Sequence, residues 1–76
     1  MPNDVIFYTT EGCSLCEQAK ALISRVMPTS AMTTVDIASD DALLAKYGER
    51  IPVLRRGDKE IGWPFSLLDI RSLLLS

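Results

Sequence analysis

The order in which strand-like and helix-like segments follow one another constrains the fold of this chain most. Residues 4–10 (DVIFYTT) form a short run of β-branched and aromatic residues, typical of a strand. Residues 14–26 place apolar side chains at spacings of three and four, which predicts an amphipathic helix. Residues 32–37 (MTTVDI) return to a strand pattern. A strand, a helix and a second strand in this order predict two parallel strands joined by a right-handed crossover.

The second half of the chain predicts a hairpin and two further helices. Residues 39–48 (SDDALLAKYG) suit a short helix that begins with capping and acidic residues. Residues 51–56 and 59–62 suit two strands, and the Gly-Asp pair between them suits a tight turn. Residues 66–75 predict a last helix. The complete order, β-α-β-α-β-β-α, predicts one α/β domain over residues 1–76, with a four-stranded mixed sheet and three helices that cover both faces.

The charge balance and the distribution of apolar residues limit the kinds of partner. The chain has 8 Lys and Arg against 10 Asp and Glu, a net charge of -2, whereas a surface that binds nucleic acid would be basic. No run of about 18 apolar residues is present that could span a membrane. Residues 1–10 lack the basic start and the apolar stretch of a signal peptide. We therefore expect a cytoplasmic protein without a nucleic-acid or membrane partner.

Both cysteines of the chain, Cys13 and Cys16, lie at the start of the helix predicted over residues 14–26. A free thiol titrates near about 8.5, and a helix N-terminus lowers that pKa to about 7 or below in comparable pairs. Residues three apart share one face of a helix, so the two sulfurs can meet. We predict that Cys13 attacks a substrate disulfide and that Cys16 resolves the mixed disulfide. We also expect Ser14 to donate a hydrogen bond to the Cys13 thiolate and Leu15 to help cover the pair.

Charged residues near the two cysteines act in both directions. Glu11 and Glu17 would raise the pKa of a nearby thiol, while Lys20, one turn further along, would lower it. The effect of the helix start is the best defined of these contributions, because it depends only on the position of the thiol relative to the first turn.

Three other uses of the cysteines stay open on the residues alone. A structural disulfide that closes so short a loop would stabilise the fold little, and a reducing cytosol disfavours it. A tetrahedral zinc site needs four ligands, while this chain has two cysteines and no histidine. A metal or iron–sulfur cluster would therefore need Asp or Glu ligands, a second chain or an exogenous thiol, and the last two are favoured. The third alternative is a non-enzymatic interaction domain with vestigial cysteines.

A second motif, Ile51-Pro52-Val53, opens the predicted hairpin. Together with Cys-Ser-Leu-Cys at a strand–helix junction, it makes the chain resemble the thioredoxin fold, and within that fold the short length resembles a glutaredoxin. The segments YTTEGCSLCEQAKALI, VDIASDDALLAKYGERIPVL and GWPF resemble the small bacterial glutaredoxin-like proteins of the DUF836 type, over residues 4–75. The resemblance implies a thiol–disulfide oxidoreductase that reduces protein or low-molecular-weight disulfides, with Cys13 as the nucleophile and Cys16 as the resolving cysteine.

The resemblance also implies roles for the residues that form the substrate groove. Pro52 matches the cis-proline that faces the cysteines, and Ile51 matches the residue whose backbone pairs with the substrate backbone. Arg50 is the candidate to pair with a glutathione carboxylate. No bound cofactor is implied. We expect a monomer that acts on a disulfide-containing protein or a small thiol substrate, with glutathione or a thioredoxin-type reductase as the electron donor.

The chain departs from the common glutaredoxin pattern in three segments. Residues 9–12 (TTEG) stand where glutaredoxins usually carry a basic residue before the first cysteine. Ser14 and Leu15 stand between the cysteines where glutaredoxins commonly have Pro-Tyr. The segment Gly62-Trp63-Pro64-Phe65-Ser66 stands where they have a Gly-Gly/Cys-Asp segment that holds the glutathione γ-glutamyl carboxylate. We expect Trp63 and Phe65 to be core residues that dock the last helix, with an apolar wall beside the cysteines as the alternative.

Overall fold

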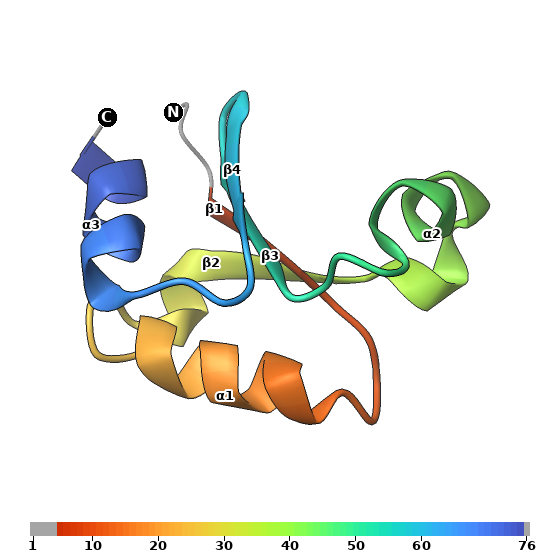
Figure 1. Ribbon diagram of the computed structural model, residues 1–76, viewed down its shortest axis with the longest axis horizontal. Helices are drawn as coiled ribbons and strands as arrows, with labels where there is room; N and C mark the ends of the chain where they lie inside the picture. Colours follow the sequence, from red (N-terminus) through yellow and green to blue (C-terminus); the bar gives the residue numbers. More distant parts are fainter. Residues whose placement is uncertain (1–4, 76) are drawn as a thin grey trace.

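A computed structural model describes residues 5–75 of the chain, and its elements follow the predicted order (Figure 1). Residue 4, where the first predicted strand begins, lies outside the described residues. No helix within residues 5–75 has the length and apolar character needed to cross a membrane. The strands are β1 (Val5–Thr9), β2 (Met32–Asp36), β3 (Val53–Arg56) and β4 (Lys59–Gly62). The helices are α1 (Ser14–Ile23), α2 (Asp41–Tyr47) and α3 (Leu67–Leu75), with single 3-10 turns at Thr29–Ala31 and Ile37–Ser39.

Helix α1 ends at Ile23 and not at Val26 as its apolar spacing predicts. After Ile23 the backbone tightens, because the N–H of Arg25 donates to the Leu22 carbonyl at 3.1 Å and the N–H of Val26 donates to the Ile23 carbonyl at 2.9 Å. These are bonds to the third residue back, the pattern of a 3-10 turn. Val26 still packs against the core, so its apolar character reflects burial in a turn and not a longer helix.

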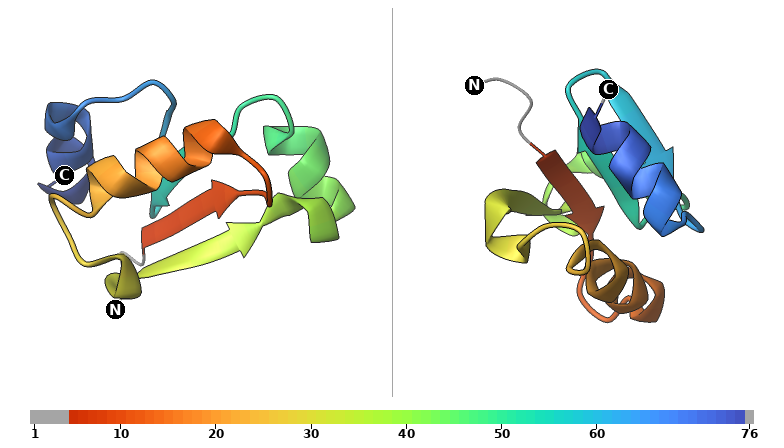
Figure 2. Two further views of the ribbon diagram at one scale, coloured as in Figure 1. Left: turned by 90° about the horizontal axis from the view of Figure 1, so that it is seen from below. Right: turned by 90° about the vertical axis from the view of Figure 1, so that its left-hand side faces the viewer.

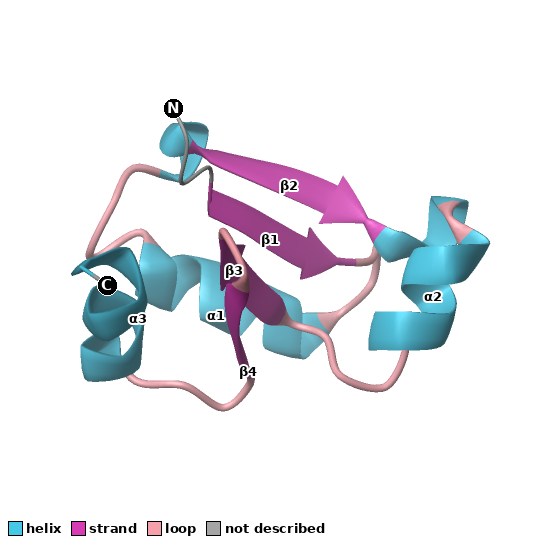
Figure 3. Cartoon of the chain, turned by 90° about the horizontal axis from the view of Figure 1, so that it is seen from above, coloured by secondary structure: helices cyan, strands magenta, loops and turns pink. Residues whose placement is uncertain are grey.

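The four strands form one mixed sheet in the order β2-β1-β3-β4, which confirms the predicted sheet (Figures 1 and 3). β1 and β2 are parallel and are joined through α1. β3 runs antiparallel to both β1 and β4. The two central strands, β1 and β3, therefore carry the apolar runs, because they are covered on both faces.

Side chains alternate between two packed layers along the central strands. Phe7 and Leu54 point to the face that is covered by α1 and α3, where Ile70 is fully buried. Tyr8 and Val53 point to the opposite face, where they meet Tyr47 of α2. Figure 2 shows α1 and α3 together on one side of the sheet. The prediction that the helices cover both faces is confirmed.

The direction of the strands separates two ends of the molecule. β1 runs toward the cysteines, and its antiparallel partner β3 runs away from them, so that Val5 pairs with Arg56 at the start of β1. The β3–β4 turn lies beyond Arg56, and Gly57 adopts a φ of 64°, a left-handed conformation that favours glycine. The hairpin turn and the cysteine loop thus lie at opposite ends of the sheet.

Candidate active site

The cysteine pair lies in the connection between β1 and α1. Gly12 adopts a φ of 80°, which turns the chain out of the strand and into the helix. Cys13 is the residue that caps α1, with an extended backbone (φ -89°, ψ 105°). Its Sγ accepts a hydrogen bond from the backbone N–H of Cys16 at 3.1 Å. The sulfur therefore occupies the position at which a Ser or Asp side chain would cap a helix.

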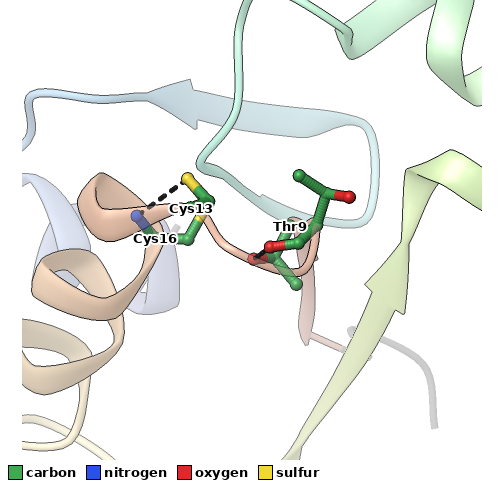
Figure 4. The surroundings of a disulfide bond; sticks show 4 residues. Thr9, Cys13 and Cys16 are labelled. Carbon is green, nitrogen blue, oxygen red and sulfur yellow. Dashed lines mark hydrogen bonds between the residues drawn. A yellow bond between two sulfur atoms is a disulfide. The ribbon is translucent and has the colours of Figure 1, made fainter.

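Cys13 and Cys16 form a disulfide, with 5.2 Å between their Cα atoms. Figure 4 shows the two side chains meeting at the first turn of α1, with the amide of Cys16 directed at the sulfur of Cys13. The two cysteines differ in exposure: Cys13 is partly exposed, whereas Cys16 is only 2% exposed and belongs to the core beneath α1. A reactant from solvent therefore meets Cys13 first.

Ser14 and Leu15, between the cysteines, both lie on the surface. The hydrogen bond to Cys13 Sγ comes from the Cys16 amide and not from the Ser14 hydroxyl. Leu15 is 45% exposed, so an apolar side chain stands in solvent beside the disulfide. An exposed leucine at this position offers an apolar contact to whatever docks at Cys13.

The segment that leads into β3 runs beside the N-terminal end of α1 (Figures 2 and 3). The Ile51–Pro52 peptide bond is cis, Pro52 is buried, and its carbonyl accepts a hydrogen bond from the N–H of Trp63 at 3.1 Å. The N–H of Ile51 donates to the Tyr47 carbonyl at 3.1 Å. Within residues 5–75 the Ile51 carbonyl has no such partner. Ile51 therefore offers an incoming backbone an acceptor, while its donor is already used.

Arg50 makes an ion pair with Glu60 of β4, with 2.7 Å between Nη2 and Oε1. The other oxygen of Glu60 accepts a hydrogen bond from the Tyr47 hydroxyl at 2.8 Å. The Tyr47 ring stacks on Tyr8, with ring centroids 4.3 Å apart, and the Arg50 guanidinium carbon lies 5.3 Å from its centroid. Arg50, which the sequence suggests for binding a substrate carboxylate, thus already binds the carboxylate of Glu60.

The pKa values of this network follow from its contacts. Burial raises the pKa of Tyr47, and its hydrogen bond to Glu60 raises it further. For Glu60, burial acts to raise the pKa, but the hydrogen bonds from Arg50 and Tyr47 outweigh it, so the pKa of Glu60 lies below its ordinary value of 4.5. The contacts therefore hold Glu60 ionised.

The Arg50–Glu60–Tyr47 network is absent from the sequence-based predictions. Glu60 is 13 residues from Tyr47 and 10 from Arg50, so no local spacing connects them. The sequence feature that could have indicated such a network is Tyr47 itself. A tyrosine on the apolar side of a helix is expected to be buried, and its hydroxyl then needs a hydrogen-bond partner. Only the β3–β4 hairpin brings that partner to it.

We predict that Glu60→Gln lowers the free energy of unfolding by about 1 kcal/mol at neutral pH. The effect is this small because Arg50 is half exposed, so solvent screens its ion pair with Glu60. A carboxylate with a lowered pKa adds stability above its ordinary pKa, and this stability is lost as pH falls. The difference in the free energy of unfolding between the parent protein and Glu60→Gln should therefore shrink as pH decreases below 4.5. Urea unfolding of both proteins at pH 7 and pH 3 measures this difference. The exposed Glu49→Gln is the control, and a difference that stays constant with pH would contradict the prediction.

Trp63 and Phe65 meet edge to face, with ring centroids 5.2 Å apart. Phe65 is 6% exposed and belongs to the core with Ile70 and Leu73 of α3. The expectation that this segment docks the last helix agrees with that burial. Trp63 is only partly buried and packs on the same core as Cys13, so its outer surface is accessible.

Among residues 5–75, no group of three or more His, Cys, Asp or Glu side chains is placed to hold a metal ion. A metal held by this chain would therefore need ligands beyond those that the described residues bring together.

Comparison with known proteins identifies the family and the fold of the chain. The model of the Glutaredoxin-like domain (DUF836) matches residues 4–75. The chain is 35% identical to protein XcR50 of X. campestris; its X-ray structure gives a TM-score of 0.79 over 92% of this chain and 93% of that one. The solution structure of XcR50 gives a TM-score of 0.80 over 93% and 91%.

Protein Ne2328 of Nitrosomonas europaea, solved by NMR, is 30% identical, with a TM-score of 0.75 over 100% of this chain and 94% of that one. No curated protein matches the chain. The family match spans both cysteines and the Ile51-Pro52 motif, and the structural matches extend over nearly the whole fold. The predicted family and fold are thereby confirmed: the chain belongs to the glutaredoxin-like (DUF836) family, with a thioredoxin-like fold.

Proposed function

We propose that the protein is a thiol–disulfide oxidoreductase that reduces protein or low-molecular-weight disulfides. The observation that carries the proposal is the asymmetry of the cysteine pair: a partly exposed Cys13 caps α1, and a buried Cys16 lies one turn further on. The amide of Cys16 and the positive end of the helix both favour a thiolate at Cys13. Such a pair serves exchange, in which the outer sulfur reacts and the inner sulfur resolves.

The proposed reaction has two steps. The Cys13 thiolate attacks one sulfur of the substrate disulfide, forms a mixed disulfide and releases the other sulfur as a thiolate. Cys16, deprotonated, then attacks Cys13 Sγ and releases the second substrate thiolate, which takes up the proton. The protein is left with the Cys13–Cys16 disulfide. Two electrons pass from the dithiol to the substrate, and a second thiol donor must return them.

The groove residues have supporting roles in this proposal. Pro52 shapes the surface beside Cys13, and the Ile51 carbonyl accepts a hydrogen bond from the substrate backbone. Leu15 contacts the substrate through its exposed side chain, and Ser14 leaves the sulfur accessible because it is small. Arg50 holds Glu60 through Nη2, so a substrate carboxylate would bind its remaining N–H groups.

The remaining proposals concern the location, the oligomeric state, the substrate and the electron donor of the protein. We propose a cytoplasmic monomer without a bound cofactor. Its substrate would be a disulfide-containing protein or a small thiol in its disulfide form. Its electron donor would be glutathione or a thioredoxin-type reductase, since either supplies the two thiol equivalents that each turnover consumes.

The redox equilibrium of the pair in glutathione buffers tests the proposal. Mass spectrometry of the alkylated protein would report the ratio of dithiol to disulfide at each buffer composition. We expect a potential of about -200 to -270 mV, the range of glutaredoxin- and thioredoxin-like catalysts. A potential below about -300 mV would instead identify a structural disulfide and overturn the proposal.

A further inference from the structure

We infer that the surface around Cys13 selects disulfides by charge, and favours a disulfide flanked by lysine or arginine side chains. The inference rests on the proposed oxidoreductase function and adds the chemical class of its substrate. The sheet register places an excess of carboxylates at the cysteine end of the molecule, and an internal ion pair engages the cation that stands closest in sequence to Pro52.

The cysteine end is the end at which β1 and β2 finish. Thr9 pairs with Asp36 in the parallel ladder, and the cysteine loop follows directly after Thr9. Helix α2 and the segment before Pro52 lie at the same end (Figure 1). The exposed carboxylates of these segments and of α1 are those of Glu11, Glu17, Asp36, Asp40, Asp41 and Glu49. The cations of the same segments are Lys20, Lys46 and Arg50.

Two of these three cations are engaged within the protein. Arg50 pairs with Glu60 at 2.7 Å, so a carboxylate brought from β4 offsets its charge. Lys46 lies over the Tyr47 ring, with 5.2 Å from Nζ to the ring centroid. Asp36 and Asp40 in turn accept hydrogen bonds from backbone N–H groups. These contacts leave the charges in place, so the six carboxylates outnumber the three cations and the cysteine end presents a net negative surface to an approaching substrate.

The opposite end of the molecule carries more cations than carboxylates: Arg25, Arg55, Arg56 and Lys59 lie there with Asp58 of the hairpin turn and Asp69 of α3. Because β3 runs antiparallel to β1, Arg55 and Arg56 lie beside Ile6 and Val5, and Lys59 follows the hairpin turn. Arg25 lies just beyond the C-terminal end of α1, which is also remote from Cys13. The overall charge of -2 thus conceals a polarised molecule, acidic where the cysteines are.

Glu11, two residues before Cys13, and Glu17, in the first turn of α1, act most directly on a disulfide that reaches Cys13. Charges within about one Debye length, about 8–10 Å at physiological salt, influence both the approach and the attack. Glutathione disulfide carries two carboxylates and one ammonium group in each half, so the acidic surface disfavours it. A disulfide beside basic side chains is favoured, and the exposed Leu15 adds an apolar contact beside the sulfur.

Three small disulfides of similar size test the inference: cystamine with two ammonium groups, hydroxyethyl disulfide with no charge, and dithiodiglycolate with two carboxylates. The reduced protein is mixed with each one, and oxidation of the Cys13–Cys16 dithiol is followed by mass spectrometry. Each rate constant is divided by that of 2-mercaptoethanol with the same disulfide, which removes the intrinsic reactivity. The ratio of cystamine to dithiodiglycolate also cancels any change in the nucleophilicity of Cys13.

We expect this normalised ratio to be about 10 or more at low salt and to fall toward 1 at about 1 M salt, where the Debye length is about 3 Å. Glu11→Lys should lower the ratio about fourfold, since it reverses a charge two residues from Cys13. Asp58→Lys makes the same change in net charge at the hairpin turn, remote from the cysteines, and should leave the ratio nearly unchanged.

The outcomes separate the two proposals. A ratio near 1 at low salt, or one below 1, would overturn charge selection while the oxidoreductase function stands. Equal effects of Glu11→Lys and Asp58→Lys would overturn it too, because the selection would then depend on net charge and not on the cysteine end. If the dithiol reacts with none of the three disulfides, the proposed function itself fails.

Discussion

Cys16→Ser is expected to stop disulfide exchange after its first step and to trap the substrate on Cys13. The buried resolving sulfur is gone, so the mixed disulfide that Cys13 forms has no internal route to release. Mixing the reduced variant with hydroxyethyl disulfide should give a stable adduct of one substrate half per chain. Intact-mass spectrometry before and after treatment with a reductant detects this adduct.

Cys13→Ser is the matched variant at the other sulfur. A hydroxyl in place of the thiolate is a far weaker nucleophile, so the exchange rate should fall by about 10³-fold or more. Cys16 remains in this variant, but it is 2% exposed and should form an adduct slowly. If Cys13→Ser forms the adduct as fast as Cys16→Ser, the assignment of the outer and inner sulfur is wrong.

Leu54→Ala is expected to destabilise the fold by about 2–5 kcal/mol. Leu54 lies in the central strand β3, is fully buried, and packs against the face that α1 and α3 cover. Truncation removes buried methyl groups and leaves a cavity that the surrounding strand and helices fill only partly. In a domain this small, such a loss takes a large share of the total stability.

Urea unfolding followed by circular dichroism measures the effect of Leu54→Ala on the free energy of unfolding. Leu68→Ala in α3 is the control, because Leu68 is 77% exposed and its truncation should change that free energy by less than about 0.5 kcal/mol. A loss below about 1 kcal/mol for Leu54→Ala would show that the core is not arranged as described.

The fold was largely predictable because its signals are local. The strand pattern near Phe7, the stripe of α1 and the Gly57 turn each depend on a few neighbouring residues. The predicted end of α1 at Val26 was wrong because it too relied on a local signal, the apolar spacing. Val26 continues the apolar spacing, but hydrogen bonds to the third residue back replace the helix there, and periodicity cannot separate a buried turn from a buried helix.

The candidate site was predictable only in part. The spacing of Cys13 and Cys16 at a helix start was enough to place both sulfurs on the first turn. No local pattern showed that the Ile51 N–H is used by Tyr47, or that Arg50 is held by Glu60. Each of these contacts joins segments whose distance depends on how the sheet is assembled.

The sequence by itself determined the order of the elements, the place of Cys13 at the start of a helix and the place of Pro52 ahead of a hairpin, because these depend on neighbouring residues. The tertiary structure alone decided that Cys16 is buried and that Glu60 neutralises Arg50. It also decided that one end of the molecule is acidic. The physical reason is strand register: the pairing of β1 with β2 and β3 brings together charges that are far apart along the chain.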